Sequence, residues 1–128
     1  MSTQTSLSDY LILSRGQWDK DASHEAIQDA IDRFYAWYDK RVSEGTIGPG
    51  HRLEREGKVV SRQATKDGPF AEAKEVVGGY WFIRAESLEE AARIASENPC
   101  LAYGLTCEVR PLDLARARAD ALTNETPT

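Results

Sequence analysis

The segment at residues 66–82, KDGPFAEAKEVVGGYWF, decides how we expect this chain to fold. Asp67-Gly68 is a strong turn dipeptide, because glycine accepts a positive φ and the aspartate side chain can bond its own backbone. Pro69 fixes φ and removes an N–H group, so a regular strand cannot continue through it. The glycine pair Gly78-Gly79 lets the backbone bend before an aromatic run. The segment therefore predicts a turn followed by a strand over residues 79–84.

Two short segments carry apolar side chains on both alternating faces. They are YLIL at residues 10–13 and YWFI at residues 80–83. This pattern is typical of strands that are covered on both sides. Residues 104–110, near the end of the domain, have a different pattern, in which apolar and polar residues alternate. This alternation predicts a further strand.

Residues 22–44 have the periodicity of an amphipathic helix, with an apolar stripe opposite a charged one. Asp21 or Ser23 can cap its start, and Gly45 is well placed to end it. A second helix is expected over residues 88–97.

The start of the helix expected over residues 88–97 is marked by a capping box, in which Ser87 is followed three residues later by Glu90. Pro111 is expected to open a short alanine-rich helix that ends near Leu122. Between the two main helices, a reversal at Glu56-Gly57 predicts a polar edge hairpin that pairs residues 52–55 with residues 58–62.

This order of elements predicts an α+β ferredoxin-like sandwich. We expect a flexible N-terminus at residues 1–8, one domain at residues 9–112, and a short helix with a disordered tail at residues 113–128. Two helices can cover only one face of a four-stranded sheet. Because an uncovered apolar face is rarely left to water, a homodimer with its sheets packed face to face is expected.

Composition excludes several classes of partner. The net charge of −5, with both signs mixed along the chain, argues against nucleic acid and anionic membranes. No apolar run approaches the roughly 20 residues of a membrane-spanning helix. The N-terminus lacks the basic and apolar regions of a signal peptide, so we expect a soluble cytoplasmic protein.

The chain has two cysteines, Cys100 and Cys107, and their spacing is not that of a metal site or a redox motif. We expect reduced, packed thiols, although a disulfide between them is an alternative.

With these motifs in order, the chain resembles the YCII-related family, specifically its DGPF-domain branch. The matching motifs are DGPF at 67–70, AEAKE at 71–75, GGY at 78–80, YGLT at 103–106 and EVRP at 108–111. The resemblance implies a dimeric ferredoxin-like α+β barrel, in small bacterial proteins mostly of unknown function. Family members are often described as possible enzymes. Some are encoded near, or fused to, extracytoplasmic-function sigma factors.

The wider family has a proposed active-site pair of one histidine and one aspartate. By resemblance the aspartate corresponds to Asp67. The chain offers only His24 and His51, and neither follows the first strand as the family's histidine does. His51 is the candidate, since it precedes the expected edge hairpin, whereas His24 lies near a helix start.

Asp67 has two interpretations, a turn-former or a general base whose pKa would have to be raised by burial or by a neighbouring carboxylate such as Glu72. The candidate catalytic residues are thus Asp67 and His51. Arg52, Glu72 and Tyr80 are the candidate substrate-binding residues, with Arg52 orienting an anionic group and Tyr80 alternatively in the core or dimer interface. We expect no metal and no cofactor.

Two functions follow as hypotheses. The first is a cofactor-free enzyme that performs acid/base chemistry on a small polar metabolite. The alternative is a non-catalytic binding or regulatory module, such as an accessory protein associated with a sigma factor.

Overall fold

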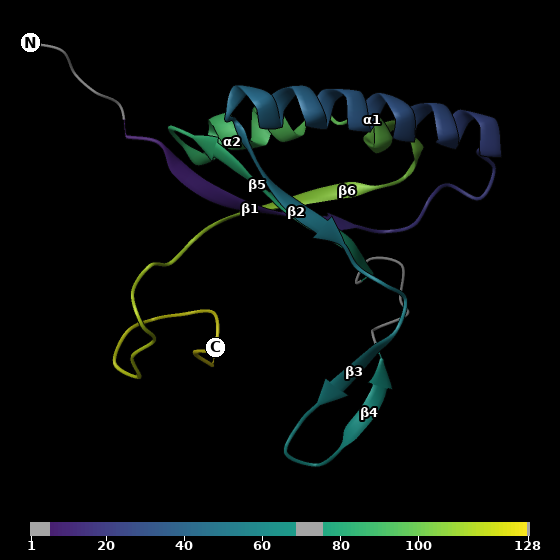
Figure 1. Ribbon diagram of the computed structural model, residues 1–128. Coiled ribbons are helices and arrows are strands. Elements are labelled where there is room, and N and C mark those ends of the chain that lie inside the picture. Colours follow the sequence, from purple (N-terminus) through teal and green to yellow (C-terminus); the bar gives the residue numbers. More distant parts are fainter. Residues whose placement is uncertain (1–5, 69–75, 128) are drawn as a thin grey trace, which may run out of the picture.

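The computed structural model describes residues 6–68 and 76–127, and its chain forms a four-stranded antiparallel sheet, two α-helices and a separate two-stranded sheet. Figure 1 shows both helices on one side of the four-stranded sheet and the smaller sheet projecting from the other side. The elements are β1 (Ser8–Arg15), α1 (His24–Glu44), β2 (Ile47–Arg52), β3 (Gly57–Val60), β4 (Thr65–Gly68), β5 (Val77–Ala85), α2 (Leu88–Ala95), the 3₁₀ helix η1 (Pro99–Tyr103) and β6 (Thr106–Pro111).

The strand order of the main sheet is β2-β5-β1-β6, and every neighbouring pair is antiparallel. This arrangement is compatible with the predicted ferredoxin-like α+β fold. The strands expected at residues 10–13, 79–84 and 104–110 are confirmed as β1, β5 and β6. The register places Leu13 opposite Tyr80 on one side and opposite Glu108 on the other.

Both long helices are confirmed, and their ends are fixed by local hydrogen bonds. Of the two candidate caps for α1, Ser23 is the one used: its side chain accepts a hydrogen bond from the Ala26 N–H at 3.1 Å. Gly45 ends α1 with φ of 82°, a conformation that glycine adopts without a Cβ clash. In α2 the Ser87 side chain accepts from the Glu90 N–H at 3.1 Å, as the capping box predicts.

The core lies between the helices and one face of the sheet. Ile12 and Ile83 are completely buried, and Trp81 packs against Phe34 of α1 with ring centroids 5.4 Å apart. Both cysteines are free thiols and Cys100 is buried, so the expectation of reduced, packed cysteines is confirmed and no disulfide joins them. Burial raises the pKa of both thiols.

The predicted pairing of residues 52–55 with 58–62 is wrong. Of residues 52–55 only Arg52 lies in a strand, β2, which pairs with β5, whereas β3 pairs with β4. Pro49 does not end β2, because β2 is an edge strand and its register shifts between Gly48 and His51. Gly50 is required there, since a Cβ at this position would lie 1.9 Å from the Tyr80 carbonyl oxygen.

The predicted turn at Asp67-Gly68 is also wrong, because both residues belong to strand β4. The chain reverses earlier, where the Ser61 N–H donates to the Ala64 carbonyl at 2.9 Å. Gly68 has no positive φ; glycine fits there because a Cβ would lie 2.7 Å from Val59 Cγ2. Pro69 and Phe70, which complete the predicted motif, lie outside the described residues.

The short helix predicted after Pro111 does not form in residues 112–127, which contain only turns and irregular chain. Leu114 is 91% exposed and Leu122 is 89% exposed, so this segment has no packing surface that would stabilise a short helix. Within the described part of the chain, no helix has the length and apolar character needed to cross a membrane.

Candidate functional site

The side of the main sheet that faces away from the helices is partly apolar, and we call it the open face. Along β1, Tyr10 and Ile12 point into the core, whereas Leu11 and Leu13 are only half-buried on the opposite side. Tyr80 and Phe82 of β5 are half-buried in the same way and alternate with buried Trp81 and Ile83. The both-sided apolar pattern in the sequence therefore corresponds to one face covered by helices and one face without them.

One row of side chains crosses the open face from edge to edge. The strand registers pair His51 with Tyr80, Tyr80 with Leu13, and Leu13 with Glu108. The His51 and Tyr80 rings have centroids 6.2 Å apart, and Tyr80 contacts Phe82 edge-on at the same centroid distance. The row thus joins the His51 imidazole at the β2 edge to an aromatic surface at its centre.

A charged cluster occupies the β6 edge of the open face. The Arg15 Nε donates to Glu108 Oε1 at 2.6 Å, and the Arg110 Nη1 donates to Glu108 Oε2 at 3.1 Å. Both hydrogen bonds lower the pKa of Glu108, and the one from Arg15 has the larger effect. Glu108 is therefore held as a carboxylate and is poorly suited to accept a proton near neutral pH.

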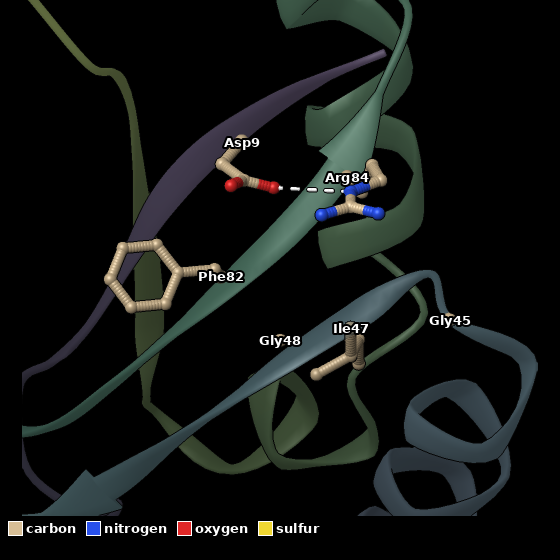
Figure 2. A pocket seen from close by; sticks show the side chains of 6 residues that line it. All are labelled: Asp9, Gly45, Ile47, Gly48, Phe82 and Arg84. Atoms are coloured by element: carbon tan, nitrogen blue, oxygen red, sulfur yellow. Dashed lines mark hydrogen bonds and ion pairs between the residues drawn. The ribbon is translucent and has the colours of Figure 1, made fainter. Parts of the chain in front are cut away.

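A pocket of about 290 Å³ opens at one end of the same face (Figure 2). It lies between the starts of β1 and β2 and the end of β5. Arg84 Nε contacts Asp9 Oδ1 at 3.4 Å across its rim. Its six lining residues are Asp9, Gly45, Ile47, Gly48, Phe82 and Arg84.

Arg52, the candidate for orienting an anionic group, ends strand β2, and its side chain is exposed. It lines a second, wider hollow of about 550 Å³ formed by residues 52–56 of the segment between β2 and β3. Glu54 and Glu56 also line this hollow, so Arg52 shares it with two carboxylates.

Asp67 lies in the separate β3–β4 sheet, directly opposite Lys58. Its side chain is 89% exposed, and its carboxylate accepts a hydrogen bond from the Lys58 ammonium group. His51 belongs to the main sheet and contacts Tyr80. The structure thus brings His51 and Tyr80 together, but the contacts described for Asp67 do not include either of them.

Of the remaining candidates, Glu72 lies outside the described residues. His24 is the first residue of α1 and is exposed. Among residues 6–68 and 76–127, no group of three or more metal-ligating side chains is close enough to hold an ion.

The sequence analysis missed the pocket beside Asp9 and Arg84 and the contact between Arg15 and Glu108. Each depends on the register between strands far apart in the chain: Asp9 pairs with Arg84, and Arg15 reaches Glu108. The polar positions that alternate with apolar residues in 105–110 were the available signal for Glu108, but nothing local indicated its partner across the sheet.

Comparison with known proteins agrees with the motifs. The YCII-related domain family matches residues 9–114. An uncharacterized protein of Rhizobium meliloti (strain 1021) is 32% identical over 109 residues, which cover 76% of this chain and 81% of that protein.

Proposed function

Since the chain belongs to the YCII-related family, we propose that it acts as a homodimer that binds a small polar metabolite on the open face and performs cofactor-free acid/base chemistry on it. The observation that carries this proposal is the position of His51. It is the cross-strand partner of Tyr80 on the helix-free side of the sheet. His51 is the proposed proton carrier.

The proposed homodimer rests on the character of the open face. Leu11, Leu13 and Phe82 are half-buried there, and α1 and α2 both lie on the opposite side of the sheet. A contiguous apolar surface of this kind is a common site of association, and a two-fold dimer would pair it with an identical surface. Packing of two sheets would also exclude water from the Tyr80 ring and from any ligand beside it.

His51 suits proton transfer better than Asp67 in this geometry. Histidine is the side chain that most readily exchanges protons near neutral pH. The Asp67 side chain is exposed and paired with Lys58, so it does not lie against an apolar surface. We therefore assign Asp67 to the pairing of β3 with β4, and Tyr80 and Arg52 to substrate positioning.

The proposal can be tested without knowing the substrate. Purified protein is incubated in D₂O with pools of small polar metabolites, and proton NMR detects C–H positions that exchange with solvent or disappear through turnover. We expect the wild type to alter at least one compound and His51→Asn to slow that reaction by at least about 100-fold, the usual minimum for a general acid or base.

Asp67→Asn is the matched control, and it should retain the rate to within about threefold because that carboxylate is assigned no proton transfer. Full activity in His51→Asn, or an Asp67→Asn variant that is inactive while folded, would contradict the assignment of His51.

A specific observation also favours the second candidate, a non-catalytic binding or regulatory module. The β3–β4 hairpin projects from the sheet (Figure 1), and its packing is chiefly between its own strands. Val60 is 74% exposed on this hairpin. Isolated two-stranded hairpins are marginally stable in water, so a binding partner would stabilise it. Co-purification of a partner that is lost when residues 57–68 are replaced by a short linker would support this function.

A further inference from the structure

We propose that the pocket beside Asp9 and Arg84 binds the carboxylate group of a small, singly charged organic acid. The proposed carboxylate site rests on the proposed function, in which the open face holds a small metabolite. Arg84 is the residue that would select this class of ligand.

The first argument is the geometry of the Arg84 side chain. Its Nε faces Asp9 Oδ1 at 3.4 Å, a long contact that orients the guanidinium group without using its terminal nitrogens. In Figure 2 those terminal nitrogens point toward the strand that carries Ile47 and Gly48. No hydrogen bond from them is found within the part of the chain that the structure describes. Two parallel N–H donors are thus available on the pocket side.

The second argument is the shape of the pocket. Gly48 and Phe82 face each other across adjacent strands, and a Cβ at Gly48 would lie 3.3 Å from Phe82 Cβ. Glycine at this position therefore leaves room above the aromatic side chain. The volume of about 290 Å³ is at the small end of the range for ligand pockets. A compact molecule with an apolar part against Phe82 and an anionic part at Arg84 fits this space.

The third argument is the balance of charge. A guanidinium group with two free N–H donors matches the two oxygens of a carboxylate. Asp9 lies on the same rim, so its negative charge offsets that of Arg84 and opposes a doubly charged group. The pair therefore favours a monoanionic carboxylate over a phosphate monoester.

Benzoate is a suitable probe, because it combines a carboxylate with an apolar ring of the right size. It is titrated into the ¹⁵N-labelled full chain while NMR follows the Arg84 Nε–H and the backbone amides of Gly48 and Phe82. We expect saturable shifts at these positions. The neutral isostere benzamide should bind at least about tenfold more weakly, since it lacks the charge-assisted pair.

Arg84→Gln should weaken benzoate binding at least about tenfold. The matched control is Arg33→Gln, because Arg33 also contacts an aspartate through Nε and is equally exposed, at 55% against 56% for Arg84. Its effect should be less than twofold. Gly48→Ala should also weaken binding, whereas Gly78→Ala should not, since a Cβ there meets nothing within 4 Å.

Equal binding of benzoate and benzamide, or unchanged benzoate binding in folded Arg84→Gln, overturns the inference. Because this readout requires no turnover, it measures binding separately from the proton transfer assigned to His51. Failure here, with His51-dependent proton exchange intact, removes the carboxylate site alone. Loss of proton exchange with normal benzoate binding removes the proposed chemistry alone.

Discussion

His51 and Tyr80 stand opposite each other in the antiparallel strands β2 and β5, with ring centroids 6.2 Å apart. Both belong to the row of side chains that crosses the open face. Phe82 continues the aromatic surface two residues further along β5. The His51 imidazole therefore borders an apolar surface. Enzymes place acid/base groups beside such surfaces to exclude water from the proton-transfer step.

Glu97 should make folding stability depend on pH in the acid range. Burial acts to raise the pKa of this carboxyl group, but hydrogen bonds from Trp37 and Arg41, at 2.8 and 2.6 Å, outweigh it and lower the pKa overall. Because the folded pKa lies below the unfolded one, the stabilisation is present above the unfolded pKa. It is lost as the pH falls through the folded pKa.

We therefore expect Glu97→Gln to lower the free energy of unfolding by about 1 kcal/mol at pH 7, a modest value because the carboxylate is partly exposed. The difference from wild type should shrink as the pH falls below the unfolded-state pKa, and it should vanish below the folded-state pKa, where the carboxyl group is protonated in both states. Urea unfolding at several pH values measures it. Glu89→Gln, at an exposed position on α2, is the control, and a pH-independent loss in Glu97→Gln would contradict this account.

Gly50→Ala should destabilise the protein strongly. The added Cβ would lie 1.9 Å from the Tyr80 carbonyl oxygen and 2.8 Å from the Trp81 Cα, so the β2–β5 pairing must shift to admit it. We expect a loss of at least about 2 kcal/mol in unfolding free energy, in the range of steric disruptions. Gly78→Ala, where the new methyl group meets open space, should change stability by under about 0.5 kcal/mol. Similar effects of the two substitutions would argue against this strand pairing.

Removing residues 115–128 should leave the domain intact. The hydrogen bonds described in this segment are local, such as those from Arg118 to Asp120 and between Thr123 and Thr126. The melting temperature of the shortened chain should stay within a few degrees of wild type, because few long-range contacts are lost. A large drop in the melting temperature would mean that residues 115–128 contribute to the core or to the dimer.

The two main helices and three strands of the main sheet, β1, β5 and β6, could be predicted from the sequence because periodicity and capping are local. Ser23, Ser87 and Gly45 each act within one helical turn. The neighbouring residues were therefore sufficient to predict the roles of Ser87 and Gly45, and to name Ser23 as one of two possible caps. No strand was predicted at Gly48-Pro49-Gly50, although these residues lie in β2. There, residues that usually break strands are accommodated at an irregular edge of the sheet.

The candidate site was less accessible to prediction, because it depends on register. His51 was singled out, but its pairing with Tyr80 follows from a shift in the β2–β5 register that no local pattern encodes. Asp9 and Arg84 are 75 residues apart in the chain and meet only because β1 and β5 are neighbours. Asp67 was expected in a turn, yet it forms a cross-strand pair with Lys58.

The most direct test of the central claim, that the open face is the functional surface and is covered by a second copy, is the molar mass in solution. Light scattering at several concentrations should give twice the 14.3 kDa mass of one chain for the wild type. Phe82→Asp, which places a charge on the open face, should give 14.3 kDa. Val60→Asp, on the exposed hairpin, should remain dimeric. A wild type that stays at 14.3 kDa throughout, or a folded Phe82→Asp that dimerises equally well, would contradict the account.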